Sequence, residues 1–391
     1  MNAPAIDSAP FAPECLTLFL NNACALGCRY CHAAPGAEPD VPLSREALVE
    51  ATGLVAASCA ARGLPMTLVL HGGGEPLLDR AEAGRVLGIV REEAARAGVH
   101  LRTYVATGGV LPAETARWAA REFDLIGLSC DGPPDIQDAQ RPTRSGAPTS
   151  AVIERTAGIL RAEGARFHVR ATITSETLDR QPEIVRYAAA RLGPAEVRLE
   201  PVYANPGEIA ALAPDDAERF VAGFMAARAA GAEAGVRVTT SLVRPDERYG
   251  PHCNVLRSVV NLVPGDIASG CFLESRASGI DRRGVRVGGP APADAPARTS
   301  APAFTLDDAR IAALRIAATA RPEECADCIC ALQCTLGCPD VCVLERDALA
   351  RHVGSFRCRA QRMLMEQLVL DAAILPAGAA ASRPGAGEVR P

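Results

Sequence analysis

The sequence predicts an α/β protein built on a parallel sheet. From residue 15 to about residue 204, short apolar segments alternate with amphipathic segments whose apolar residues recur at helical spacing. Strands that are joined by helices pair in parallel, with right-handed crossovers. Six such units form either an open doubly wound sheet or a partial barrel, and in both architectures ligands lie at the carboxyl ends of the strands.

The strands and helices of this region are marked by local signals. Ser44 and Asp79 can cap two helices that Gly63 and Gly98 end, and Pro182 suits the first turn of a later helix. The expected strands are the apolar runs at residues 16–20, 67–71, 101–106, 125–129, 168–173 and 197–201.

Beyond this region the regular alternation of strand and helix patterns ends. We expect a helix at residues 215–230, then a hairpin of two strands, 259–263 and 267–272, around a Pro-Gly turn. A segment rich in proline and alanine at 288–303 predicts a flexible loop, and a last helix is expected at 355–375.

Composition excludes several classes of protein. The 391 residues, 48% of them hydrophobic and 22% charged, suffice for more than one domain. The net charge of −5 does not indicate a nucleic-acid-binding protein, which would typically be basic. No apolar run approaches the roughly 20 residues of a membrane helix. No secretory signal is visible, so we expect a cytoplasmic protein with no nucleic-acid or membrane partner.

The fifteen cysteines indicate metal binding, because the cytosol keeps thiols reduced and their odd number argues against a fully paired disulfide framework. Cys24, Cys28 and Cys31 directly follow the first strand. Three thiolates on one loop can hold three irons of a cubic 4Fe–4S cluster and leave the fourth iron open to a small molecule, whereas electron-transfer clusters are usually closed by four cysteines. A zinc site that uses these cysteines and His32 is the alternative.

Polar and glycine residues follow two further strands. Gly73 and Gly74, after the second strand, allow close backbone approach to a ligand, and Glu75 can accept a hydrogen bond from a ligand ammonium group. Ser129 ends the fourth strand and Arg141 follows it; a guanidinium matches a carboxylate with two parallel hydrogen bonds.

Together these motifs resemble the radical S-adenosylmethionine (SAM) superfamily, and in particular its peptide and sulfatase maturases. The family uses Cys-x3-Cys-x-aromatic-Cys, with Tyr30 at the aromatic position here, and a Gly-Gly-Glu-Pro motif; Gln137 replaces its usual histidine. The resemblance covers residues 15 to about 365 and implies a partial (β/α)6 TIM-like barrel. It also implies that the cluster is held by Cys24, Cys28 and Cys31, and that SAM is bound by Tyr30, Gly73, Gly74, Glu75, Ser129 and Arg141.

A second cysteine set resembles the SPASM extension of that family, which carries auxiliary 4Fe–4S clusters. The spacing is Cys-x2-Cys-x5-Cys-x3-Cys, followed by one more cysteine near the last helix. By this resemblance one cluster takes Cys325, Cys328, Cys334 and Cys358, and the other takes Cys253, Cys271 and Cys338.

The second of these clusters lacks a fourth cysteine at the place where some family members have one, shortly before Cys253. The site is therefore open, completed by another group, or absent; Cys330 and Cys342 are extra cysteines, and the sequence does not choose between them. His71 is expected to pack at its strand end. The remaining cysteines have no partner pattern and are expected to be buried: Cys15, Cys59 and Cys130.

The resemblance implies a domain layout and a function. We expect a tail at 1–14, a radical SAM barrel at 15–235, a SPASM domain at 236–375 and a disordered tail at 376–391. One electron, from a reductase such as flavodoxin or ferredoxin, would cleave SAM to a 5′-deoxyadenosyl radical that abstracts hydrogen from a ribosomally made precursor peptide. The product would be a thioether or carbon–carbon cross-link, with one or two auxiliary clusters accepting the remaining electron; the short segment before Cys24 predicts no separate leader-binding domain there.

Three other functions remain open from the sequence. A sulfatase maturase would form formylglycine, but in that family an aspartate base follows the cysteine that matches Cys271, and here Phe272 stands in its place. A non-catalytic iron–sulfur electron carrier and a zinc-binding interaction module are disfavoured by the barrel pattern and by the motifs of Glu75 and Arg141. No residue is assigned a catalytic role.

Overall fold

This computed structural model describes residues 10–33, 41–203, 209–245, 250–275, 284–290, 303–319, 321, 323–345 and 347–374. Most of the expected loop at 288–303, the expected tail at 376–391 and the first residues of the tail at 1–14 lie outside the described residues.

One sheet of eleven strands organises the described chain, in the order β11-β10-β9-β8-β1-β2-β3-β4-β5-β6-β7. Strands β1 to β7 run parallel to one another, as do β1 and β8. The strands are β1 Cys15–Phe19, β2 Met66–His71, β3 Leu101–Thr107, β4 Leu125–Ser129, β5 Phe167–Ile173, β6 Glu196–Pro201, β7 Arg237–Thr239, β8 Val259–Val263, β9 Ile267–Ser269, β10 Arg286–Gly289 and β11 Thr305–Leu306.

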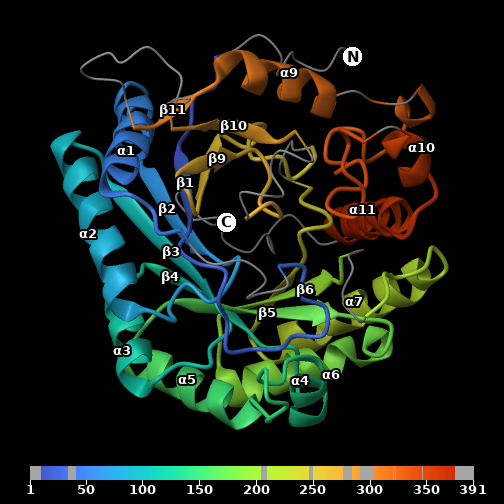
Figure 1. Cartoon of the computed structure of the whole chain (residues 1–391). Coiled ribbons are helices and arrows are strands. Elements are labelled where there is room, and N and C mark those ends of the chain that lie inside the picture. Colours follow the sequence, from blue (N-terminus) through green and yellow to red (C-terminus); the bar gives the residue numbers. More distant parts are fainter. Residues whose placement is uncertain are drawn as a thin grey trace.

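Helices follow most of the parallel strands and lie outside the curved sheet, which is an open, partial barrel (Figure 1). This arrangement of strands and helices confirms the predicted α/β fold and the parallel pairing. Of the two predicted architectures, the structure has the partial barrel and not the open doubly wound sheet. The helices are α1 Arg45–Ala60, α2 Arg80–Arg96, α3 Ala113–Glu122, α4 Pro134–Gln140, α5 Ser150–Ala162, α6 Gln181–Tyr187, α7 Asp216–Glu233, α9 Asp308–Thr319, α10 Ala348–His352 and α11 Phe356–Ile374.

The expected helix signals act as predicted. The Ser44 hydroxyl accepts a 3.1 Å hydrogen bond from the Ala47 amide at the start of α1, and Asp79 caps α2 by accepting from two amides. Gly63 and Gly98 follow these helices with φ of 63° and 67°, in the left-handed region that glycine favours.

The core lies between the sheet and its helices. Strands β1, β2 and β4 carry fully buried residues such as Leu16, Leu68 and Leu128, because a parallel sheet of this kind is covered on its helical face and faces an enclosed interior. Within the described segments, no helix combines the length and apolarity needed to cross a membrane.

The C-terminal hairpin continues the barrel sheet. Strand β8 pairs in parallel with β1, and β9 pairs with β8 around the Pro-Gly turn, so the hairpin is confirmed although β9 ends at Ser269 and not at 272. Strands β7, β10 and β11 and helix α9 were not predicted, because they are short or have weak periodicity. Helix α11 packs against α7 and thereby holds the cysteine-rich segment beside the barrel.

Candidate cofactor and metal sites

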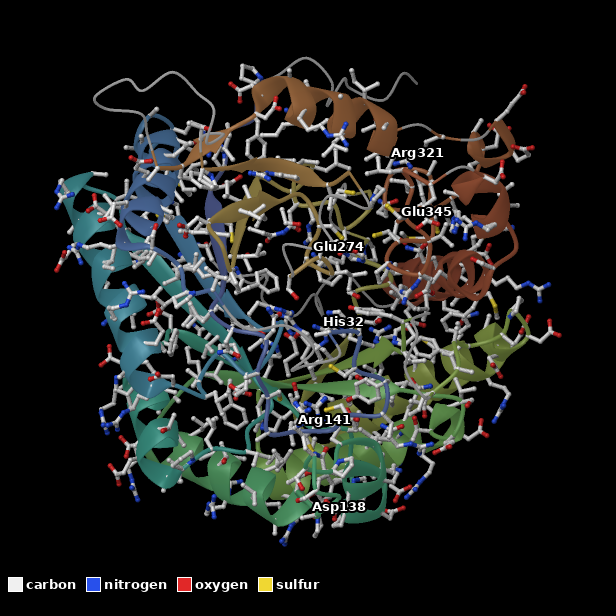
Figure 2. All side chains as sticks on the ribbon, in the orientation of Figure 1. His32, Asp138, Arg141, Glu274, Arg321 and Glu345 are labelled. Carbon is white, nitrogen blue, oxygen red and sulfur yellow. The ribbon has the colours of Figure 1, made fainter. Side chains whose placement is uncertain are left out.

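The first cysteine loop follows β1 and is anchored to the segment after β4. The amides of Gly27 and Arg29 donate to the carbonyls of Pro142 and Gln140 at 2.8 and 3.0 Å. These contacts hold a loop that has no regular secondary structure against the strand ends. His32, one residue beyond the loop's last cysteine, lies in the interior enclosed by the sheet (Figure 2).

The three thiols of this loop are neighbours. Burial raises the pKa of the Cys24 thiol to about 11, and Glu75, Cys28 and Cys31 raise that pKa further. Burial also raises the pKa of Cys28, which Arg141 counteracts. Three soft thiolate donors on one loop, beside a cation, fit a cluster that carries negative charge.

The glycines after β2 pack against the backbone just before the cysteine loop. A Cβ on Gly74 would collide with the carbonyl oxygen of Ala23, and one on Gly73 with the side chain of Asn22. The Gly74 and Glu75 amides donate to the carbonyls at residues 21 and 23, at 3.0 and 2.8 Å. The close approach expected of these glycines is therefore made, in this structure, to the chain itself.

Glu75 is buried and held by three donors. Its carboxylate accepts hydrogen bonds from the Gly108 amide at 2.7 Å, the Thr107 hydroxyl at 2.9 Å and the Leu77 amide at 3.1 Å. Burial raises the pKa of Glu75, while these hydrogen bonds and Arg141 lower it. These hydrogen bonds fix the carboxylate in position beside the cysteine loop.

Arg141 is oriented by a chain of two hydrogen bonds, which is called the relay below. One guanidinium nitrogen donates to the Tyr30 hydroxyl at 2.6 Å, and that hydroxyl donates to Asp131 at 2.7 Å. Asp131, fully buried, also accepts from Gln140 and from the Thr172 amide. The Arg141 Nε is buried and has no acceptor among the described residues.

Two further residues near this strand end, Gln137 and Asp138, are structural supports in the observed geometry. Gln137 is fully buried; its amide oxygen accepts from the Asp131 amide at 2.9 Å and its nitrogen donates to Thr149. Asp138 accepts from the Thr149 and Ser150 amides at the start of α5. Ser129 ends β4, half-buried.

Two residues of this site were missed from the sequence. Thr107 ends β3, and both it and Gly108 donate to Glu75. A Cβ on Gly108 would lie 3.3 Å from the Glu75 carboxylate and 3.7 Å from the Arg141 guanidinium, so Gly108 separates the two. The rule that ligands lie at the carboxyl ends of parallel strands would have found them, because Thr107 and Gly108 follow β3 as Glu75 follows β2.

The C-terminal cysteines fall into two groups. Burial raises the pKa of Cys325, and Cys328 and Cys358 raise it further. Burial likewise raises the pKa of Cys334 to about 11, with Cys358 and Cys325 among the neighbours that raise it. These four thiols are thus neighbours in the structure.

The other group surrounds a pocket beside the hairpin. Its lining includes Cys253, Cys271, Cys338 and Cys342, together with His252. Burial raises the pKa of Cys253 to about 12, and Cys271 and Cys342 raise it further; Cys253 and Cys271 in turn raise that of Cys338. In the part of the chain that the structure describes, no group of three histidine, cysteine or acidic side chains is placed to hold a single metal ion.

An aromatic array connects the two regions. The ring of Tyr203 lies 6.3 Å from the ring of His32 and 6.3 Å from that of Phe272, which in turn lies 6.3 Å from His252. Arg170 donates to the Tyr203 hydroxyl at 2.8 Å. Phe272, at the position of the family's base, therefore presents an aromatic ring to the interior.

The remaining expectations concern packing. His71 lies with its ring centroid 5.8 Å from that of Phe19, so it packs at its strand end as expected. Cys59 and Cys130 are buried in the core as predicted, whereas Cys15 is half-buried at the start of β1.

The comparisons agree with this architecture. Residues 18–188 match the family described as "Radical SAM superfamily". This part of the chain is therefore similar to a radical SAM domain, and that family implies a 4Fe–4S cluster and SAM as cofactors.

Among individual proteins, the chain is similar to a cysteine-type anaerobic sulfatase-maturating enzyme of Clostridium perfringens, with 28% identity over 116 residues; this match spans 29% of the chain and 31% of the relative. The solved structure of native anSMEcpe with bound AdoMet superposes with a TM-score of 0.67 at 16% identity, covering 93% of this chain and all of that one. Streptococcus suis SuiB bound to precursor peptide SuiA matches with a TM-score of 0.51 at 13% identity, covering 67% of this chain and 60% of that one.

Proposed function

We propose that the protein is a radical SAM enzyme that cleaves SAM reductively and modifies a ribosomally made peptide by a thioether or carbon–carbon cross-link. When bound, the cluster and SAM supply a 5′-deoxyadenosyl radical that removes hydrogen from an unactivated carbon. The relay from Asp131 through Tyr30 to Arg141, beside the three thiols and Glu75, is the observation that carries this proposal.

Each residue of the proposed SAM and cluster site has a defined task. Cys24, Cys28 and Cys31 hold the cluster. Arg141 binds the SAM carboxylate, and Glu75, which the Gly108 amide holds in place, binds the amino group. Because the two charges of the methionyl part bind to oppositely charged, pre-positioned side chains, SAM is oriented before the reaction begins.

Ser129, Gly73 and Gly74 complete the proposed SAM site, at the carboxyl ends of β4 and β2. Gly73 and Gly74 keep the β2 loop tight against the cysteine loop, so the amino-group acceptor stays in reach of the cluster. Their part is therefore to hold Glu75 and the loop together.

The two C-terminal cysteine groups support the proposal of auxiliary clusters. One would be held by Cys325, Cys328, Cys334 and Cys358; the other would use Cys253, Cys271 and Cys338. Closing a bond onto a substrate radical releases one electron and one proton, and a cluster beside the interior is suited to receive that electron. Electron acceptance is therefore the physical reason why a domain with auxiliary clusters would lie beside the barrel.

In this proposal the barrel spans residues 15–235 and the C-terminal domain spans residues 236–375, and strands of both belong to one sheet. The peptide would enter between these two parts. SuiB was solved with its precursor peptide and anSMEcpe with a Cp18Cys peptide, which supports a peptide substrate for the chain. A reductase such as flavodoxin or ferredoxin would deliver the first electron.

Formylglycine formation is the second candidate, favoured by the sequence match to the sulfatase-maturating enzyme. It requires a base at the reacting carbon, and Phe272 presents an aromatic ring between Tyr203 and His252. This contact favours cross-linking over formylglycine formation.

The test is anaerobic incubation of the reconstituted protein with SAM, dithionite and a cysteine-containing peptide, taken from a sulfatase or from any short reading frame that is found beside this gene. Deoxyadenosine is measured by chromatography, and the peptides by mass spectrometry and with an aldehyde-reactive hydrazide. A cross-link removes two hydrogens and leaves no aldehyde; an aldehyde product would favour the second candidate. Absence of deoxyadenosine would refute both.

A further inference from the structure

We propose that Cys342 is the fourth protein ligand of the cluster site formed by Cys253, Cys271 and Cys338, so that this site is closed. The inference rests on the auxiliary clusters of the proposed function and names a ligand that the spacing of the cysteines left open. Clusters closed by four cysteines are typical of electron transfer, so this ligand decides what the cluster can do.

The first argument is the shape of the site. All four thiol-bearing residues line one pocket beside the β8–β9 hairpin. Cys253 precedes β8 and Cys271 follows β9, while Cys338 and Cys342 come from one short segment, residues 338–342. The two ends of the hairpin and the later segment thus line the same pocket, each contributing two cysteines.

The segment that carries Cys338 and Cys342 is held by its own backbone. The Val341 amide donates to the Gly337 carbonyl at 3.0 Å, and the Glu345 amide donates to the Cys342 carbonyl at 2.9 Å. Gly337 has φ of 87°, a conformation that few other residues adopt. These bonds order the backbone on both sides of Cys342.

The second argument is the neighbourhood of the thiols. Cys253 interacts electrostatically with both Cys271 and Cys342, and Cys338 interacts with Cys253 and Cys271. Cys253 is therefore a common neighbour of the other three. Together with the shared pocket, this makes Cys342 a member of the same group of thiols.

Cys330, the other extra cysteine, belongs elsewhere. Its electrostatic neighbours are Cys328 and Cys334, which are members of the other group. Its thiol is buried and donates to the backbone carbonyl of Gln361 at 3.4 Å. Cys330 is thus a core thiol beside a site that already has four cysteines.

A closed site changes how the substrate must be held. A cluster with an open iron could bind a substrate thiolate directly, whereas a cluster with four protein thiolates can only exchange electrons. The reacting residue of the peptide would then be held by side chains of the chain, in the interior near Phe272 and Tyr203. Closing the cross-link delivers one electron to the cluster and one proton to a base or to water.

The test compares Cys342→Ala with the matched control Cys330→Ala. Both are made in a background in which Cys24, Cys28 and Cys31 are alanine, so that only the auxiliary sites bind iron. We expect about eight irons per chain in the background and in Cys330→Ala, four for each auxiliary cluster. For Cys342→Ala we expect loss of about four irons, or oxidative conversion to a three-iron cluster, which is paramagnetic where the oxidised four-iron cluster is not.

An unchanged iron content and spectrum in Cys342→Ala would overturn the assignment, as would the same loss in Cys330→Ala. A second measurement needs no variant: the full-length holoprotein is alkylated before and after iron chelation, and each cysteine is quantified by mass spectrometry. Cys342 should be protected with Cys253, Cys271 and Cys338 and become reactive with them. Alkylation of Cys342 in the holoprotein while those three stay protected would refute the proposal.

These readouts count iron and thiols and do not depend on turnover. Wild-type protein that binds iron at the auxiliary sites but never cleaves SAM would refute the proposed function and leave the Cys342 assignment standing. Conversely, full turnover by a protein whose Cys342 is alkylated in the holo state would refute only the ligand assignment.

Discussion

Arg141 donates a 2.6 Å hydrogen bond to the hydroxyl of Tyr30, although the two residues lie 111 positions apart in the chain. The bond joins the cysteine loop after β1 to the segment after β4. It makes the aromatic residue between the second and third cysteines a support for the guanidinium. The following predictions test this arrangement and its surroundings.

Tyr30→Phe should raise the KM for SAM by roughly ten- to a hundred-fold, because a hydrogen bond to a charged group contributes about 1.5–3 kcal/mol. The ring and its 5.9 Å contact with the Arg141 guanidinium are kept, so kcat should change less. Deoxyadenosine formation at varied SAM concentration measures both. Tyr187→Phe, which removes a 2.9 Å bond to Glu154 on the outside of the barrel, is the control and should change neither.

Gly108→Ala should abolish SAM binding while the protein still folds. A Cβ there would meet the Leu26 side chain at 2.6 Å and approach both Glu75 and Arg141. Equilibrium dialysis with labelled SAM and the melting temperature measure the two properties. Gly53→Ala, in α1 where a Cβ meets nothing within 4 Å, should keep SAM binding and add about 0.5–1 kcal/mol of stability. Normal SAM affinity in Gly108→Ala would contradict the site.

Cys28→Ala should abolish SAM cleavage, because the cluster loses one of its three ligands. Cys328→Ala should spare SAM cleavage without peptide and stop product formation. Iron analysis, deoxyadenosine release and mass spectrometry of the peptide separate these effects. Cys59→Ala, at a core cysteine on α1, should retain both activities. Full product formation by Cys328→Ala would remove the role proposed for the C-terminal cysteines.

Acid should destabilise the protein in part through His168. Burial lowers the pKa of His168 to about 3, with Arg198 as the next cause, while an unfolded histidine titrates near 6.5. Because the folded pKa is lower, this stability is complete above about pH 6.5 and is lost as the pH falls toward 3. At pH 5.5 the loss is on the order of 1 kcal/mol.

Melting temperatures of the anaerobic protein at pH 8 and pH 5.5 provide the measurement. The melting temperature of His168→Gln should fall less on acidification than that of the wild type, since glutamine does not titrate. His100→Gln, at an exposed position, should behave as the wild type does. Equal acid losses in wild type and His168→Gln would show that His168 makes no contribution.

Much of the fold could be predicted because its signals are local. Apolar runs, caps such as Ser44 and Asp79, and turn glycines each act within a few residues, so the six central strands were predicted close to their observed bounds. The pairing of β8 with β1 was not predicted, because it joins residues about 240 positions apart and depends on which edge of the sheet remains free.

The sequence by itself determined the types of donor: three thiols in one loop, an acidic residue and an arginine at strand ends, and seven further spaced cysteines. Tertiary structure alone decided which of them meet. Spacing cannot tell which of Cys330 and Cys342 is a ligand, because both lie close in sequence to cysteines of both auxiliary groups. The fold decides: Cys330 lies in the core beside Gln361, and Cys342 lines the hairpin pocket. Likewise, only the closing of the sheet brings Tyr30, Asp131 and Arg141 together, because hydrogen bonds depend on distance in space and not along the chain.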